Sequence, residues 1–215
     1  MKSMVQRYFW FFVGVAINSF GVAFITQAAL GTSPISSVPY VLSLKFTPSL
    51  GQFTFVFNLL FILLQFLLLR KDFPPIQFLQ IVVNLFFSAC LDVSMALLAF
   101  LQPENFLARF VCLLVGCAVL AVGIAIEVAP NVLMVPGEGT VKAFSIVTGK
   151  RFGSVKVVFD VTLIVIAVIL SLIFFHGING LGLGTIVSAL IVGQIVNFVN
   201  RHFHAIDRIA ALAQA

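Results

Sequence analysis

The chain has 215 residues, of which 61% are apolar and 9% are charged. Soluble domains have roughly 45–50% apolar and 25% charged residues, so these values exclude an ordinary soluble domain. The formal net charge of +5 comes from basic residues in short loops between apolar runs, where such residues orient membrane helices, so it does not indicate nucleic-acid binding.

Apolar runs recur along the chain, each long enough to cross roughly 30 Å of hydrocarbon as a helix. We expect six membrane-spanning helices, at residues 8–29, 51–69, 76–101, 108–129, 154–175 and 182–200. The basic head and apolar stretch of residues 2–24 also resemble a signal peptide. Because this stretch is long and has a counterpart later in the chain, we interpret it as a retained first helix. The predicted fold is an all-α integral membrane protein with one membrane domain over residues 1–215.

Two further segments are moderately apolar, bounded by Pro and Gly, and too short to span a bilayer. They run from Gly31 to Pro48 and from Val135 to Lys150. Both predict re-entrant or broken-helix segments, which membrane proteins tolerate where they are enclosed by protein or line a cavity.

The two halves of the chain resemble each other. A shift of about 102 residues aligns them without a gap over residues 7–69, and the matched pairs include Arg7/Arg109, Gly14/Gly116, Ala16/Ala118, Gly21/Gly123, Ala23/Ala125, Pro34/Pro136, Ser43/Ser145 and Gly51/Gly153. A small further shift makes Asp92 equivalent to Asn197 and Gln80 equivalent to Thr185. Matches at Gly, Pro and Arg indicate a duplication, because chance matches between apolar helices are mostly Leu and Val. Each copy has three spans, so we predict two inverted repeats, at about residues 7–101 and 108–203.

The basic residues test this topology independently. With the N-terminus in the cytoplasm, the cytoplasmic set is Lys2, Arg7, Arg70, Lys71, Lys142, Lys150, Arg151, Lys156, Arg201 and Arg208, against Lys45 and Arg109 outside. This bias follows the positive-inside rule and predicts that both termini are cytoplasmic.

The sequence contains no recognisable enzyme motif, so we do not expect an enzyme. The cysteines lie within apolar runs without metal-ligand spacing, and we expect neither a metal nor a cofactor. Ionisable residues at membrane depth are the remaining candidates, because they are costly in hydrocarbon.

Three carboxylates are candidate proton-coupling groups, because burial raises the pKa of a carboxyl group. Asp92 follows Asn84 and Ser88 at four-residue spacing on one helix face, although it also fits a helix end near the outer interface. Asp160 is the repeat equivalent of Asn58 and lies one turn from Lys156, with the alternative that the two form a structural ion pair near the inner surface. The third is Glu138, with the alternative that it caps its own helix.

Gly-rich turns are the candidate solute-binding elements, because helix N-termini at a broken helix attract carboxylates and phosphates. The predicted solute-binding residues are Gly31, Thr32, Ser33, Asn58, Asn84, Gly137, Glu138, Gly139, Thr140, Gly184, Thr185 and Asn197. For the asparagines the alternative is that they hold helices together. Thr140 is expected to cap the short helix after its turn. Glu127 is interpreted as a boundary residue, and the small residues of the first and fourth spans predict close helix packing.

Residues 29–34, 136–140 and 182–193 are Gly-rich segments that indicate a family resemblance. These Gly-rich segments resemble the bacterial YitT/YczE-like family of small multipass membrane proteins. Some YitT-like members carry a C-terminal soluble domain, and this chain ends at Ala215, so the resemblance is closer to the YczE-like branch. The resemblance implies a bacterial cytoplasmic-membrane location and supplies no catalytic residues.

The function expected from these observations is secondary, proton-coupled transport of a small anionic or zwitterionic solute, with the site between the repeats. The expected partners are the lipid bilayer and the solute, with homo-oligomerisation left open. Two alternatives remain at this point: a non-transporting partner subunit or regulator of another membrane protein, and a channel.

Overall fold

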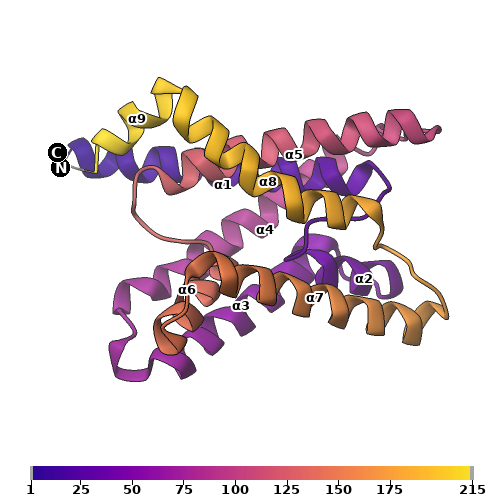
Figure 1. Cartoon of the computed structure of the whole chain (residues 1–215), viewed down its shortest axis with the longest axis horizontal. Helices are drawn as coiled ribbons and strands as arrows, with labels where there is room; N and C mark the ends of the chain where they lie inside the picture. The colour runs from indigo at the N-terminus through magenta and orange to yellow at the C-terminus, as the bar shows by residue number, and fades with distance from the viewer. Residues whose placement is uncertain (1, 214–215) are drawn as a thin grey trace.

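The computed structural model describes residues 2–213, so Met1, Gln214 and Ala215 of the predicted 1–215 domain lie outside the described residues. Within this range the chain is helical throughout, with no strand (Figure 1). The α-helices are α1 (Lys2–Gln27), α2 (Ser37–Lys45), α3 (Leu50–Leu69), α4 (Gln80–Leu97), α5 (Phe106–Val128), α6 (Pro136–Thr148), α7 (Phe152–Phe175), α8 (Leu183–His202) and α9 (His204–Ala211). Two short 3₁₀ turns, Arg70–Asp72 and Pro75–Leu79, join α3 to α4.

Six helices are long and apolar enough to cross a membrane, which confirms the predicted number. They cover Met4–Gln27, Leu50–Asp72, Pro75–Leu97, Phe106–Val128, Phe152–Phe175 and Leu183–His202. Large apolar side chains on their outer faces are exposed; on α7, Val157, Val161, Val165, Ile169 and Ile173 form such a stripe at four-residue spacing. These lengths and apolar outer faces identify a multipass membrane protein.

The two predicted short segments are short helices. α2 has 9 residues and α6 has 13, which at 1.5 Å per residue gives about 14 and 20 Å, less than the roughly 30 Å of a bilayer core. α6 starts at Pro136, where a missing N–H costs nothing, and ends at Gly149 in the left-handed region with φ 67°.

The helices form two layers (Figure 1). One layer contains α1, α5, α8 and α9, and the other contains α2, α3, α6 and α7. α4 links the layers, because it packs against α1 in one and α3 in the other. α7 packs on α2 and α6, whereas α8 packs on α5, so α7 and α8 diverge from their connection toward the end of the molecule that carries the termini.

The most extensive helix contact is the crossing of α1 and α5. A Cβ atom on Gly21 would lie 2.5 Å from Leu120 Cα, and a Cβ atom on Gly116 would lie 2.8 Å from the backbone N of Ile25. Small residues therefore let the two backbones approach closely, as expected for membrane helices. Around the crossing lies the main apolar core, which includes the fully buried Phe11, Val15, Leu113 and Cys117.

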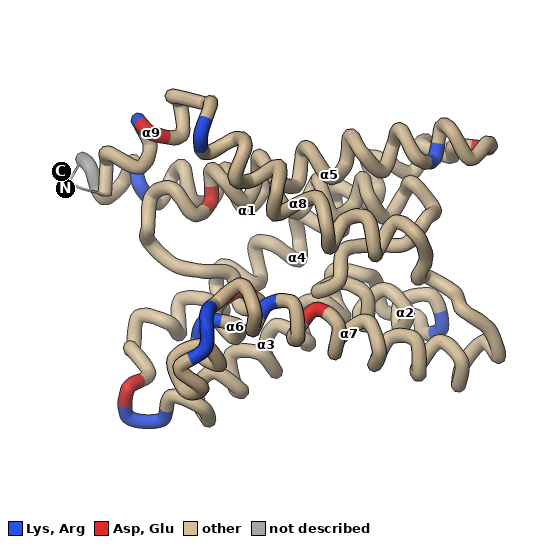
Figure 2. Tube along the Cα trace, viewed as in Figure 1, with Lys and Arg blue, Asp and Glu red and all other residues tan. Residues whose placement is uncertain are grey.

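Charged residues are concentrated at the ends of the helices (Figure 2). Most Lys and Arg residues lie at the end of the molecule where the N- and C-termini meet, and few lie at the opposite end. Arg7 connects two segments there, since Nε donates to Pro130 O at 3.0 Å and Nη2 to Asn131 O at 2.9 Å. The start of α1 is thereby tied to the α5–α6 connection.

Candidate functional site

The first Gly-rich turn (residues 31–34) packs directly on the third (residues 182–185). Gly184 N donates to Leu30 O at 2.7 Å, and Thr32 N donates to Thr185 Oγ1 at 3.2 Å. A Cβ atom on Gly31 would lie 2.5 Å from Thr185 Oγ1, and the φ of Gly31 is 122°, so this position requires glycine. The amides of Thr32 and Gly184 are therefore bonded within the chain in this state and do not face a ligand.

The second turn (residues 136–140) is the first turn of α6. Thr140 lies inside the helix, because the helix begins at Val135 and Pro136, so the expectation that Thr140 caps it was wrong. The Thr140 hydroxyl instead donates to Pro136 O at 2.9 Å and to Phe61 O of α3 at 3.2 Å. This side chain therefore joins α6 to α3.

A pair of glutamines holds the second turn against α3 and α4. Gln65 Nε2 donates to Pro136 O at 3.1 Å, and Gln65 and Gln80 exchange hydrogen bonds at 3.1 and 3.2 Å. Both side chains are buried, and a Cβ atom on Gly139 would lie 2.6 Å from Gln65 Oε1. Gln65 was not among the predicted residues, although it is a lone amide in a run of Leu and Phe and could have been found on that ground.

The residue that follows the first turn, Ile35, touches the second turn. A Cβ atom on Gly137 would lie 3.0 Å from Ile35 Cδ1, so the Ile35 side chain fills the space above this glycine. The three turns, which lie far apart in the sequence, thus meet in the interior. Every predicted solute-binding residue except Glu138 and Asn197 is buried.

Glu138 lies in the first turn of α6, beside this meeting point. The helix begins at Pro136 without a side-chain cap, and the alternative that Glu138 caps its own helix remains a prediction. One carboxylate oxygen of Glu138, Oε2, is buried and has no hydrogen-bond partner among the described residues. Most buried polar atoms are bonded, so this oxygen requires an explanation.

Glu127 lies at the end of the fourth span, as expected of a boundary residue, but it is buried. Its side chain is 3% exposed, and Oε2 accepts a hydrogen bond from Asn18 Nδ2 at 2.8 Å. The residue lies at the end of α5, but α1 passes directly over it at Gly14, whose missing side chain leaves room for the Glu127 backbone. The sequence did not indicate this burial, because it results from the crossing of α1 over this end of α5.

Asp160 forms the predicted pair with Lys156. The Lys156 Nζ lies 3.2 Å from Asp160 Oδ1 and 3.1 Å from Oδ2. Glu138 is near enough to interact electrostatically with both residues of this pair and with Glu127. We call Glu127, Glu138, Lys156 and Asp160 the buried charge cluster, of which the Lys156 side chain is 34% exposed. Among residues 2–213, no three His, Cys, Asp or Glu side chains lie close enough to hold a metal ion.

Asp92 holds the start of α3. Its Oδ1 accepts from Gly51 N at 2.8 Å and its Oδ2 from Ser49 Oγ at 2.6 Å. These bonds satisfy polar groups at a helix N-terminus, which is a structural role. The role of Asp92 in proton coupling remains a prediction.

The predicted polar face of α4 joins α3. Asn58 Nδ2 donates to Asn84 Oδ1 at 2.8 Å, and Ser88 Oγ lies 3.4 Å from the same oxygen. Asn84 Nδ2 also donates to Phe55 O at 2.9 Å. Asn58 and Asn84 are thus brought together, but as a contact between helices.

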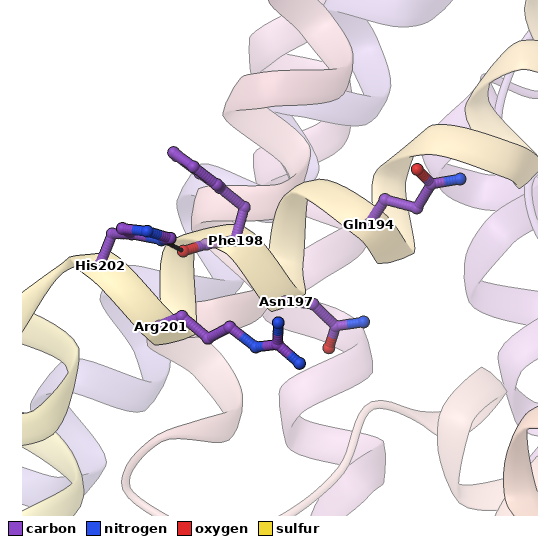
Figure 3. A pocket seen from close by; sticks show the side chains of 5 residues that line it. All are labelled: Gln194, Asn197, Phe198, Arg201 and His202. Carbon is purple, nitrogen blue, oxygen red and sulfur yellow. Dashed lines mark hydrogen bonds between the residues drawn. The ribbon is translucent and has the colours of Figure 1, made fainter.

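Asn197 lies apart from the other candidates. It is exposed on α8, where it lines a hollow of about 300 Å³ with Gln194, Phe198, Arg201 and His202 (Figure 3). Figure 3 shows Asn197 and Arg201 pointing to the same side of α8, away from the Phe198 ring.

Comparison of the sequence with known proteins identifies a family. The model of a family of unknown function, DUF6198, matches residues 5–201. The chain belongs to the DUF6198 family. It is also similar to the uncharacterized protein YyaS of Bacillus subtilis (strain 168), with 21% identity over 212 residues that cover 94% of this chain and 98% of YyaS. No solved structure matches the chain.

The DUF6198 match covers all three turns and all six candidate spans, apart from Met4 at the start of the first span and His202 at the end of the last. The similarity to YyaS relates the chain to a bacterial protein over nearly its whole length. Neither match names the YitT/YczE-like family, so that resemblance remains a prediction.

Proposed function

We propose that the protein is a secondary transporter of a small solute, coupled to protons and built from two inverted repeats, residues 7–101 and 108–203. We place it in a bacterial cytoplasmic membrane with both termini in the cytoplasm. The solute would bind where the three Gly-rich turns meet, between the repeats, as in other transporters that use broken helices.

The α1–α5 crossing supports the repeats. Gly21 lies against Leu120, and its repeat equivalent Gly123 lies against Asn18, which is the equivalent of Leu120. Gly14 lies against Glu127, and Gly116 lies against Ile25, in the same reciprocal relation. A two-fold relation between the halves produces this pattern, because each contact then occurs twice with the partners exchanged.

The helix contacts follow the same relation. α1 packs on α4 as α5 packs on α8, and α2 packs on α3 as α6 packs on α7. The contact of α3 with α6 corresponds to that of α7 with α2. Three spans in each copy make the second copy run in the opposite direction across the membrane, which agrees with an inverted repeat.

The observation that best supports the transport proposal is the unpaired Oε2 of Glu138 in the buried charge cluster. A purely structural carboxylate at this depth is expected to have its oxygens bonded, because an unpaired buried polar atom costs about 1–3 kcal/mol. The cluster combines the acidic Glu127, Glu138 and Asp160 with Lys156 as the one base. A proton bound by the cluster offsets one of its negative charges, so proton uptake and release belong to its chemistry.

The packing of the turns supports a mechanism with two states. The turns pack together in this structure, directly or through Ile35, so a solute reaches the point between them only after they separate. α6 carries Glu138 in its first turn and packs on α3 and α7. Movement of α6 therefore changes the surroundings of the Glu138 carboxylate, which is how solute binding would be coupled to a proton.

The test is solute-driven proton flux. Purified protein in liposomes that contain a pH-sensitive dye would be challenged with a broad metabolite library. We expect at least one solute to change the internal pH with the wild-type protein, and Glu138→Gln to abolish the change because the side chain can no longer bind and release a proton. Glu104→Gln is the matched control, since Glu104 is exposed in the α4–α5 connection.

Binding would be measured beside flux. A solute at about a hundred times its Kd stabilises the protein by roughly 2.7 kcal/mol, which a thermal-shift assay detects. If the folded protein neither binds nor moves any library member, the transporter proposal fails and a partner-subunit role is favoured. Solute passage without proton movement in the wild type would contradict proton coupling alone.

A further inference from the structure

The contact between α3 and α4 is closed. Gly51 lies directly against Ser88 O and Asp92, so that a Cβ atom on Gly51 would lie 2.6 Å from Asp92 Cγ. Asp92 also accepts hydrogen bonds from Gly51 N and Ser49 Oγ, and further along the helices Asn58 donates to Asn84. A missing side chain, a cap and an amide pair thus hold α3 on α4.

The equivalent helices α7 and α8 do not make this contact. α7 packs on α2 and α6 and α8 packs on α5 and α9, and the two helices diverge toward the termini (Figure 1). A Cβ atom on Gly153 would meet nothing within 4 Å, and the same holds for Gly193. The start of α7 has no side-chain cap, and Asn197 on α8 is exposed.

The unused groups on α7 and α8 occupy the positions that form the contact between α3 and α4. With the shift of about 102 residues, Gly51 corresponds to Gly153. With the shift of about 105 residues that relates the last spans, Ser88 corresponds to Gly193 and Asp92 to Asn197. Asn accepts hydrogen bonds at helix N-termini about as well as Asp, so Asn197 is chemically suited to the role that Asp92 has.

Glycine in a helix interior costs roughly 0.5–1 kcal/mol relative to alanine, and in this state Gly193 gives no packing in return. A second state in which another backbone approaches Gly193 closely would explain why this position is glycine. The hollow of about 300 Å³ beside Asn197 and Arg201 is lined by residues of α8 alone, so no residue of α7 covers this part of α8 in the present state (Figure 3).

We propose that α7 closes on α8 in a second state, with Gly153 against the backbone at Gly193 and Asn197 capping the start of α7, while the contact of α3 with α4 opens. This inference rests on the proposed transport function, for which it supplies the moving contact. Gly153 and Asn197 are positioning residues of the closed contact and do not bind the solute. In this proposal the α3–α4 contact is closed when α7 and α8 are apart, and it opens when α7 closes on α8.

The test measures the distance between α7 and α8 without any solute. Spin labels would be placed at Lys150→Cys and Asn200→Cys, both exposed at the termini end of these helices. Cys90, Cys112 and Cys117 would first be replaced by Ala, and the protein would be placed in lipid nanodiscs at pH 5 and pH 8. We expect two distance populations, with the second shorter by several ångströms.

Gly153→Leu is the decisive variant. It meets open space in the present structure, so it should leave the thermal stability unchanged, but it should remove the short population because its side chain blocks the approach of α8. Ser154→Leu, at an exposed neighbouring position, should keep both populations. A second label pair, Gln52→Cys and Val93→Cys, should gain a longer component when the α7–α8 distance shortens.

A single distance population at both pH values, or a short population that persists in Gly153→Leu, would overturn the inference. These results do not depend on transport. Solute flux together with a single distance population would support the transporter proposal and contradict the closure of α7 on α8. Two populations that respond to Gly153→Leu would support the contact even if no library solute were moved.

Discussion

The polar side chains buried among the apolar helices differ in whether their hydrogen bonds are satisfied. Asn58, Asn84 and Asp92 have their hydrogen bonds satisfied between α3 and α4, whereas one oxygen of Glu138 has none among the described residues. A satisfied side chain stabilises one packing arrangement, and an unpaired one loses less when its surroundings change. This difference makes Glu138 the better candidate for coupling and Asp92 the better candidate for stability.

Asp92→Ala tests the structural role at the residue scale. The change leaves Gly51 N and Ser49 Oγ without their acceptors, so we expect the protein to lose about 1–3 kcal/mol of stability. A lower Tm in a detergent thermal-stability assay would show the loss. Asp72→Ala is the control, because Asp72 is exposed in the α3–α4 connection and should leave the Tm unchanged. An unchanged Tm in Asp92→Ala would contradict the structural role.

The sequence identifies these residues more readily than it identifies their partners. Asp92 stands out because a carboxylate is rare in an apolar run, but its bonds to Ser49 and Gly51 depend on the packing of α4 on α3. Glu127 was assigned to a boundary because its burial depends on where α1 crosses α5. Asn197 was placed with the site because it is an amide within an apolar span, yet it is exposed on α8 in this state.

At the scale of helices, the α1–α5 crossing holds the two halves together. Hydropathy predicts that both helices span the membrane, and Pro and Gly predict that α2 and α6 are short, because these signals are local. Which helices cross, and at which residues, depends on contacts between distant parts of the chain. The glycines matched between the halves were the one local sign of that crossing.

Gly21→Leu should weaken the crossing. The first side-chain atom would lie 2.5 Å from Leu120 Cα and Leu120 N, and backbone atoms cannot move aside as a flexible side chain can. We expect a loss of about 1–3 kcal/mol, as for other overpacked cores. The Tm of the purified protein measures this loss. Gly193→Ala is the matched control, since it meets no atom within 4 Å and should raise the Tm slightly through helix propensity. Equal effects of the two changes would exclude the crossing as the cause.

At the scale of the whole molecule, the orientation of the protein in the membrane decides which side the diverging ends of α7 and α8 face. The two helices separate toward the end that carries both termini and most of the basic residues (Figures 1 and 2). If that end is cytoplasmic, as the positive-inside rule indicates, α7 and α8 diverge toward the cytoplasm in the present structure. The proposed closure of α7 on α8 would then bring these two ends together on the cytoplasmic side.

Cysteine labelling in intact cells measures this orientation. In the background without Cys90, Cys112 and Cys117, a membrane-impermeant maleimide should label Glu104→Cys in the α4–α5 connection without permeabilisation. Lys71→Cys in the α3–α4 connection should react only after the cells are permeabilised, because these two connections lie at opposite ends of α4. The reverse pattern would invert the molecule, and α7 and α8 would then diverge toward the outside. Both outcomes leave the geometry of the α7–α8 contact unchanged, so the labelling fixes the direction of access independently of whether the contact closes.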